Sequence, residues 1–259
     1  MGAAPLRYVL AAGRVGLVCL IGLCSVASPG VASPAVSGTE RPLIAIDVGH
    51  SRSRPGAISA RGEPEFAFNR GLALVVERVL RDRGFRTRLI GEQGDIEKLS
   101  DRSAAAASAD AALFLSLHHD SVQPQYLAPW QVDGQEQRYG DRFSGFSLFI
   151  SRSNSDAGES LDCARAIGER LRASGYIPSP HHAEPIRGEN RPRADASNGV
   201  YYYDDLVVLK AAAMPAVLVE AGIIVNRRDE VVLAKASTRD RLATAIAEGL
   251  RRCLGRGPP

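Results

Sequence analysis

Residues 43–65 read LIAIDVGHSRSRPGAISARGEPE, and this stretch indicates the fold class. It opens with the apolar run Leu43–Ile46, which is typical of a short buried strand in a parallel sheet. We expect a loop from Asp47 to His50, because Gly49 lets the backbone turn sharply. His50 then follows the carboxyl end of a buried strand, where open α/β sheets bind ligands. Glu65 begins the next helical pattern and reaches the same edge. These two residues predict the start of a metal site.

Strands and helices alternate along the rest of the chain. The spacing of apolar residues predicts helices over 65–83, 101–110, 161–173 and 240–254 and strands over 85–90, 111–117, 145–151 and 215–219. Two polar segments, 121–144 and 175–198, are expected to be long irregular loops. The alternation predicts a single α/β domain with a mixed, mostly parallel sheet sandwiched between helices.

The first 32 of the 259 residues have the layout of a secretory signal peptide. Arg7 and Arg14 flank the N-terminal part, an apolar core covers 15–24, and small residues lead to a cleavage point after Ala32. The alternative is a retained membrane anchor, but the apolar core is shorter than the ~20 residues of a spanning helix. We therefore expect export, with the periplasm as the compartment.

The remaining sequence is organised simply. Residues 33–41 are rich in Ser, Pro and Gly and predict a short tether. Residues 42–256 show no internal repeat and no second linker, so we expect one catalytic domain there. No appended wall-binding module is visible in the sequence.

The charge balance argues against a nucleic-acid partner. The chain has 32 basic and 29 acidic residues, and two of the basic residues, Arg7 and Arg14, belong to the predicted signal peptide. The rest of the chain is therefore nearly neutral and lacks the basic excess on which binding to phosphate backbones depends.

Two cysteines, Cys163 and Cys253, lie outside the predicted signal peptide, each in a predicted helix. In an oxidising compartment they could form a disulfide, but their spacing does not show that the side chains meet. Two buried free thiols are the equal alternative.

Three strand ends and one helix start bring chemically useful side chains to the same edge. Two imidazoles and one carboxylate suit zinc and leave its fourth position open. We assign His50, Glu65 and His118 to the metal. We assign Glu220 as the general base that takes the proton of the attacking water. Glu220 ends a buried apolar strand, where a charge must be compensated, and this favours a functional role.

Each proposed ligand also has a structural explanation. His50 could bond to loop backbone, Glu65 would favour the helix dipole, and His118 could cap a strand together with His119. A competing His-x-x-Glu spacing occurs at His181–Glu184, but no clear strand precedes it, and we interpret it as a loop that borders the cleft. The His-Glu-x-x-His and Gly-x-Ser-x-Gly motifs are absent from the sequence, which argues against thermolysin-like and serine hydrolases.

Several motifs together resemble zinc-dependent N-acetylmuramoyl-L-alanine amidases. They are IDVGH (46–50), PGA (55–57), Gly62 with Glu65 and Asn69, LSLH (115–118), and PAVLVEAG (215–222) with Asn226 and Glu230. The resemblance runs in order from about residue 43 to 254. The sequence departs from the family pattern at SRSR (51–54), at His119-Asp120, and in the long segments 121–144 and 176–203.

The resemblance implies hydrolysis of the amide that joins the lactyl group of N-acetylmuramic acid to L-alanine in peptidoglycan. It also implies that zinc is bound by His50, Glu65 and His118 and that Glu220 is the catalytic carboxylate. The alternatives are a zinc peptidase acting on stem peptides and a non-catalytic peptidoglycan-binding relative, although a binding module would not need Glu220.

Other partners are less defined by the sequence. Arg52, Arg54, Arg187 and Arg191 either meet carboxylates of the stem peptides or are solvated loop charges. The sequence identifies no protein activator, and we expect no stable membrane span after signal cleavage.

Overall fold

The computed structural model describes residues 41–255. The predicted signal peptide (1–32), the predicted tether up to residue 40, and residues 256–259 lie outside the described residues. Within 41–255, no helix is both long enough and apolar enough to cross a membrane. All the elements below belong to this part of the chain.

One seven-stranded sheet forms the centre of the described region, in the order β2-β1-β3-β9-β6-β8-β7. The strands are β1 (Leu43–Val48), β2 (Arg86–Ile90), β3 (Leu113–Asp120), β6 (Ser147–Ile150), β7 (Arg193–Asp195), β8 (Val200–Tyr202) and β9 (Ala216–Ile223). Strands β2, β1, β3 and β9 pair in parallel, as do β6 and β8, whereas β6–β9 and β7–β8 are antiparallel. The predicted mixed, mostly parallel sheet is therefore confirmed.

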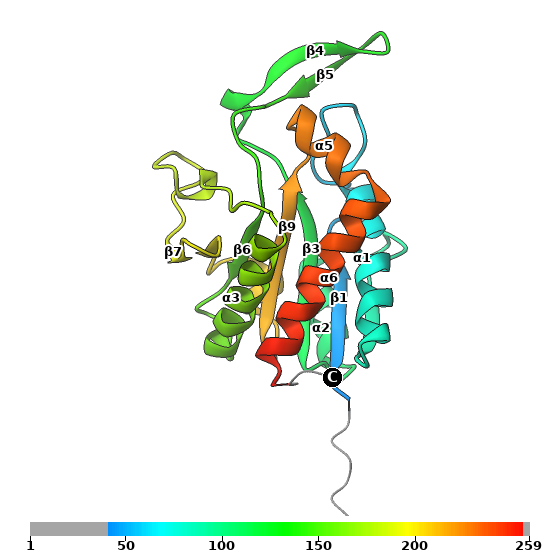
Figure 1. Ribbon diagram of the computed structural model, residues 1–259, viewed down its shortest axis with the longest axis vertical. Coiled ribbons are helices and arrows are strands. Elements are labelled where there is room, and N and C mark those ends of the chain that lie inside the picture. The colour runs from blue at the N-terminus through cyan, green and yellow to red at the C-terminus, as the bar shows by residue number, and fades with distance from the viewer. Residues whose placement is uncertain (1–40, 256–259) are drawn as a thin grey trace, which may run out of the picture. The chain divides into compact units, whose positions relative to one another are not determined.

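Helices cover both faces of this sheet (Figure 1). On one face lie α1 (Glu65–Asp82), α3 (Ala157–Ala173) and α6 (Ala236–Cys253), and on the other lie α2 (Leu99–Ala107) and α4 (Val207–Lys210). A short helix, α5 (Arg227–Leu233), follows β9, and two 3-10 turns are η1 (Pro124–Tyr126) and η2 (His181–Ala183). The predicted α/β sandwich is confirmed.

The alternation of side chains along β1 explains its continuous apolar sequence. Ile44, Ile46 and Val48 face the core under α1, α3 and α6, whereas Leu43 and Ala45 face the core under α2 and α4. Successive side chains of a strand point to opposite faces. A strand covered by helices on both faces is therefore apolar at successive positions, as in Leu43–Ile46, and its one acid, Asp47, is paired with Arg102.

Two strands continue further than the sequence predicted. β3 runs to Asp120 and β9 to Ile223, so that His118 and Glu220 are strand residues and not the first loop residues. The reason is that β3 and β9 continue to pair: His118 is opposite Glu220, and after an irregularity Asp120 is opposite Ile223. Pairing with a neighbouring strand, which local sequence does not show, sets these ends.

The expectation of an irregular loop over 121–144 is wrong for its central part. Strands β4 (Ala128–Val132) and β5 (Gln135–Tyr139) form an antiparallel hairpin at the top of Figure 1. Asp133 and Gly134 join them with φ values of 49° and 76°, as in the two-residue turns with positive φ that favour hairpins. The segment 175–198 is also partly regular, since it contains η2 and β7.

A disulfide joins Cys163 of α3 to Cys253 of α6, with 4.9 Å between the Cα atoms. Of the two alternatives left open by the sequence, pairing is therefore the one that the structure contains. The bond crosslinks two helices on the same face of the sheet.

Candidate metal centre

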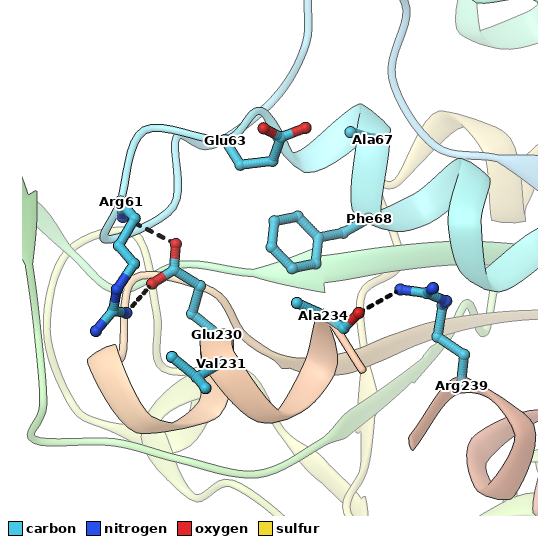
Figure 2. A pocket seen from close by; sticks show the side chains of 8 residues that line it. All are labelled: Arg61, Glu63, Ala67, Phe68, Glu230, Val231, Ala234 and Arg239. Carbon is cyan, nitrogen blue, oxygen red and sulfur yellow. Dashed lines mark hydrogen bonds and ion pairs between the residues drawn. The ribbon is translucent and has the colours of Figure 1, made fainter. Parts of the chain in front are cut away.

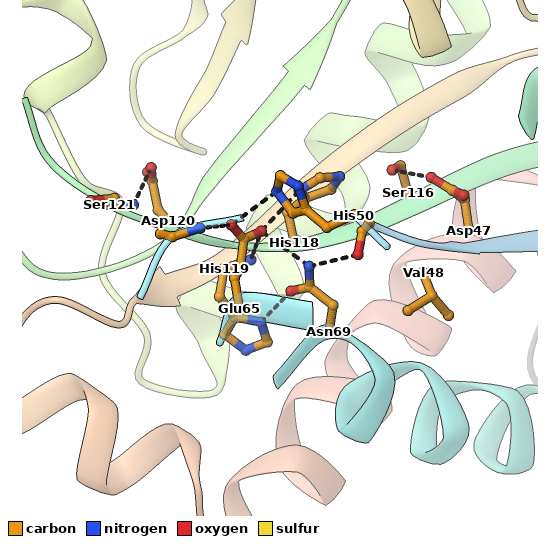
Figure 3. Close-up of polar contacts among 12 residues, drawn as sticks. Asp47, Val48, His50, Glu65, Asn69, Ser116, His118, His119, Asp120 and Ser121 are labelled. Atoms are coloured by element: carbon orange, nitrogen blue, oxygen red, sulfur yellow. Dashed lines mark hydrogen bonds and ion pairs between the residues drawn. The ribbon is translucent and has the colours of Figure 1, made fainter. Parts of the chain in front are cut away.

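His50, Glu65 and His118 meet at the carboxyl edge of the sheet (Figure 3). The Nε2 atom of His50 lies 2.9 Å from Oε2 of Glu65, and Nδ1 of His118 lies 3.0 Å from Oε1. One ligand atom from each of the three residues lies within 4.8 Å of the others. Glu65 is buried, whereas both imidazoles are partly exposed. This arrangement can surround one cation and leave it open on one side.

The loop after β1 approaches the three side chains so closely that glycine is needed. A Cβ atom at Gly49 would lie 2.3 Å from Nε2 of His118, and one at Gly56 would lie 2.3 Å from Oε2 of Glu65. His50 itself has a φ of 71°, which is uncommon for a residue other than glycine. The backbone therefore forms a tight cradle around the candidate ligands.

Arg102 of α2 holds the residues just before this loop. Its side chain is only 2% exposed, and Nη1 lies 2.6 Å from Oδ1 of Asp47 and donates to the carbonyl of Val48. Nη2 donates to the carbonyl of His50, and Ser116 donates to the second oxygen of Asp47. We did not predict this interaction from the sequence. A signal was present, because an acid within a buried strand needs a partner.

Glu65 is fixed by further hydrogen bonds on both carboxylate oxygens. The amide of Asn69 donates to Oε1, and the backbone N–H of Ala57 donates to Oε2. Burial alone would raise the pKa of Glu65, but the hydrogen bonds with His118 and His50 outweigh it and lower the pKa below its ordinary value. Glu65 is therefore a carboxylate at neutral pH, as a metal ligand must be.

His119 lies on the opposite face of β3 from His118. Its ring packs on Phe68, and its Nδ1 atom is 2.8 Å from the side-chain oxygen of Asn69. Burial lowers the pKa of His119 to about 4. His119 is therefore neutral and donates this hydrogen bond, which supports Asn69 and through it Glu65.

Glu220 lies beside the three candidate ligands on the neighbouring strand. It is directly opposite His118 in the β3–β9 pairing. Burial, together with the nearby charges of Asp120 and Glu65, raises its pKa well above the ordinary value. Among the described residues, its Oε2 atom has no hydrogen-bond partner. A carboxyl group in this state can exchange a proton with a water molecule or a substrate.

Glu230 of α5 ties the same loop to the end of β9. It accepts a hydrogen bond from the hydroxyl of Ser59. It also accepts from the backbone N–H of Arg61 and forms an ion pair with the Arg61 side chain, as Figure 2 shows. Asn226 caps α5 by accepting from two backbone N–H groups of its first turn. Asn226 and Glu230 accompany the PAVLVEAG motif in the sequence. In the structure, Asn226 caps α5 and Glu230 links α5 to the loop after β1.

Two hollows lie near these elements. One of about 250 Å³ is lined in part by His50, His118 and Arg54, and it adjoins the candidate metal centre. The other, of about 480 Å³, is lined by residues of α1 and α5 such as Phe68 and Glu230 (Figure 2), but not by the candidate ligands. Of these two hollows, the first is therefore the one that borders the candidate ligands.

Most of the other polar residues highlighted in the sequence lie elsewhere. His181 and His182 lie with Asp120, whereas Glu184 pairs with Arg142, so the His-x-x-Glu spacing does not bring its own ends together. The Arg191 guanidinium stacks over the ring of Tyr203 at 3.5 Å. Arg52, Arg54 and Arg187 are exposed.

The family described as N-acetylmuramoyl-L-alanine amidase (Amidase_3) matches residues 44–252. N-acetylmuramoyl-L-alanine amidase AmiA of Escherichia coli K12 is 26% identical over 227 residues, covering 83% of this chain and 76% of AmiA. The amidase LytC of Bacillus subtilis 168 is 28% identical over 229 residues, covering 86% of this chain and 38% of LytC.

Solved structures show the same fold. Ami1 of Mycobacterium smegmatis matches with a TM-score of 0.66 at 23% identity, covering 83% of this chain and 98% of Ami1. The catalytic domain of CwlV from Bacillus (Paenibacillus) polymyxa matches with a TM-score of 0.62 at 24% identity, covering 83% of this chain and 99% of that domain. The chain belongs to the N-acetylmuramoyl-L-alanine amidase family, a class of peptidoglycan hydrolases that are typically metal-dependent.

Proposed function

We propose that this amidase uses zinc, held by His50, Glu65 and His118, to hydrolyse the amide between N-acetylmuramic acid and L-alanine. The observation that carries the proposal is the convergence of the three ligand atoms within 4.8 Å, with Glu220 directly opposite His118. Two imidazoles and one carboxylate are the donor set of many catalytic zinc sites. The close approach of Gly49 to His118 also fits a site shaped for this group.

When bound, zinc supplies a Lewis acid that polarises the amide carbonyl and makes water more acidic. Glu220 accepts the proton of the water that adds to the carbonyl carbon. As the carbon–nitrogen bond breaks, Glu220 gives that proton to the departing amino group of L-alanine. A raised pKa suits the first step, because it makes Glu220 a stronger base than an ordinary carboxylate.

Fragment analysis of digested peptidoglycan tests the reaction. Purified protein incubated with sacculi should release stem peptides with a free L-alanine amino group, as detected by mass spectrometry. A chelator should abolish release, and zinc should restore it. Cleavage inside the stem peptide would instead identify a zinc peptidase, and binding without cleavage would identify a non-catalytic relative.

The Glu220→Gln variant separates the general base from the ligands. It should retain zinc, measured by elemental analysis, while turnover falls at least about 100-fold, because proton transfer is lost. The matched control is Glu136→Gln, which changes an exposed glutamate of β5 and should keep full activity. Loss of zinc from Glu220→Gln would contradict the division of roles.

We further propose that residues 1–32 are a signal peptide cleaved after Ala32, that 42–256 form the catalytic domain, and that the mature protein works in the periplasm. The support is that the substrate of its relatives is a wall polymer outside the cytoplasm. N-terminal sequencing of the secreted protein should begin at Ser33.

CwlD of Clostridioides difficile has been solved in complex with the GerS lipoprotein. The digestion is therefore run with purified protein alone, which shows whether this chain needs an activator.

A further inference from the structure

A second cluster of metal-binding side chains lies further along β3. Oδ2 of Asp120, at the end of β3, is 3.2 Å from Nε2 of His181 and 2.8 Å from Nε2 of His182. The three ligand atoms lie within 4.8 Å of one another. Both imidazoles, which η2 carries, are buried, with His181 only 1% and His182 only 7% exposed. Residues some sixty positions apart thus converge on one carboxylate oxygen.

Neighbouring groups direct the Nε2 atoms of both histidines at this oxygen. Nδ1 of His182 lies 2.8 Å from Oε2 of Glu189, and because a carboxylate accepts, this nitrogen carries a hydrogen. Nδ1 of His181 is occupied by the hydroxyl of Ser179 at 2.8 Å. A histidine whose far nitrogen bonds to a carboxylate is the usual arrangement around a protein-bound metal.

One buried atom of the cluster lacks a well-aligned hydrogen bond. Nε2 of His181 has no hydrogen bond within residues 41–255, although Oδ2 of Asp120 is 3.2 Å away. Buried polar atoms are rarely left unpaired. A cation between His181, His182 and Asp120 would occupy this nitrogen and would also balance the carboxylate.

A protonated His182 is the competing explanation of the same geometry. Burial would lower the pKa of His182, but the charges and hydrogen bonds of Asp120 and Glu189 outweigh it and raise the pKa to about 9. An imidazolium between two carboxylates would then explain the contacts of His182. It leaves Nε2 of His181 with a contact to Asp120 at 3.2 Å and no well-aligned hydrogen bond, whereas a shared cation would satisfy both histidines.

We propose that Asp120, His181 and His182 bind a second divalent cation of the zinc type, separate from the ion held by His50, Glu65 and His118. Two imidazoles and one carboxylate are ligands that zinc accepts. The cation would fasten η2 and the loop around it to the carboxyl end of β3.

Counting metal ions tests this proposal. Full-length mature protein is loaded with zinc and desalted, and its zinc content is measured by inductively coupled plasma mass spectrometry. The wild type should hold two equivalents, and His182→Gln and Asp120→Asn should each hold one. His50→Ala should also hold one, and His50→Ala/His182→Gln none. Glutamine at position 182 can still bond to Glu189, so the loop keeps that contact.

Thermal stability gives a second measurement that does not depend on activity. In the His50→Ala background, added zinc should raise Tm by at least about 3 °C, because a cation that binds only the folded state stabilises it. The further change His182→Gln should remove this shift. Glu136→Gln, which changes an exposed glutamate of β5 outside both clusters, is the control and should keep two equivalents.

A single equivalent in the wild type that disappears in His50→Ala and persists in His182→Gln would overturn the second site and favour the protonated histidine. This result leaves the amidase proposal untouched. Conversely, two equivalents together with an absence of stem-peptide release would overturn the proposed reaction and not the second site.

Discussion

Asn69 connects two buried groups that belong to different elements. Its amide nitrogen donates to Oε1 of Glu65 and to the carbonyl of Gly49, and its oxygen accepts from His119. One side chain of α1 therefore holds a candidate ligand, the loop after β1 and the far face of β3. Such a residue orients the metal centre without touching the metal.

Replacing Asn69 with leucine tests this role. The variant loses both amide bonds and leaves the buried Nδ1–H of His119 without an acceptor, which should cost about 1–3 kcal/mol of unfolding free energy. Zinc affinity should fall about 10–100-fold, because Glu65 loses its orienting partner. Urea denaturation and competition with a zinc indicator measure the two effects.

The control for Asn69→Leu is Gln93→Leu, which removes an exposed amide. It should change the unfolding free energy by no more than about 0.5 kcal/mol and leave zinc affinity unchanged. An Asn69→Leu protein with wild-type zinc affinity would show that Glu65 does not need this support.

Local sequence explains some of these residues and not others. His50, Glu65, His118 and Glu220 could be selected because each follows an apolar run or begins a helix, and parallel strands bring such positions to one edge. Asp120, His181 and His182 could not, because no spacing rule relates positions sixty residues apart on a strand and a loop. Only the folded chain shows that they converge.

At the scale of elements, α2 is attached to the metal-binding loop through Arg102. This buried arginine pairs with Asp47 and donates to the carbonyls of Val48 and His50. The position of His50 therefore depends on a helix that contributes no ligand. A displaced α2 would release the backbone at the first candidate ligand.

The Arg102→Met variant should lose about 3–5 kcal/mol of unfolding free energy, because Asp47 stays buried with its charge uncompensated. Combining it with Asp47→Asn should recover part of the loss.

Arg78→Met is the matched control for Arg102→Met. Arg78 lies 2.6 Å from Asp240 on the surface and is 58% exposed, so its removal should cost no more than about 1 kcal/mol. Denaturant titrations of all four proteins give these values.

Elements differ in how far the sequence predicted them. The apolar runs of β1, β3 and β9 predicted strands correctly, because they are buried on both faces. The hairpin β4–β5 was missed, although Asp133-Gly134 is a turn signal, because polar residues such as Gln131 and Glu136 hide the alternation. The ends of β3 and β9 were also missed, since pairing between strands sets them.

At the scale of the whole described region, the disulfide joins α3 and α6 across a sequence separation of 90 residues. These helices pack on the same face of the sheet as α1 and share one core with it. A crosslink over so long a loop restricts the unfolded chain more than the folded one. It therefore stabilises the helical layer as a unit.

The free energy of unfolding of the Cys163→Ser/Cys253→Ser variant should be about 2–4 kcal/mol lower than that of the oxidised wild type. A reducing agent should lower the stability of the wild type by a similar amount and leave the variant unchanged. Equal stability of oxidised and reduced wild type would show that the bond does not contribute. Denaturant titrations with and without reductant make this comparison.

The hairpin β4–β5 also has a practical consequence. Trp130 is the only tryptophan of the sequence, and its indole N–H donates to the carbonyl of Ala60, in the loop that leads to Glu65. The guanidinium groups of Arg61 and Arg227 lie 5.2 and 5.3 Å from its ring. Fluorescence excited at wavelengths that only tryptophan absorbs therefore comes from Trp130 alone. Titrations with a metal ion or a muropeptide can be followed by this fluorescence without an added label.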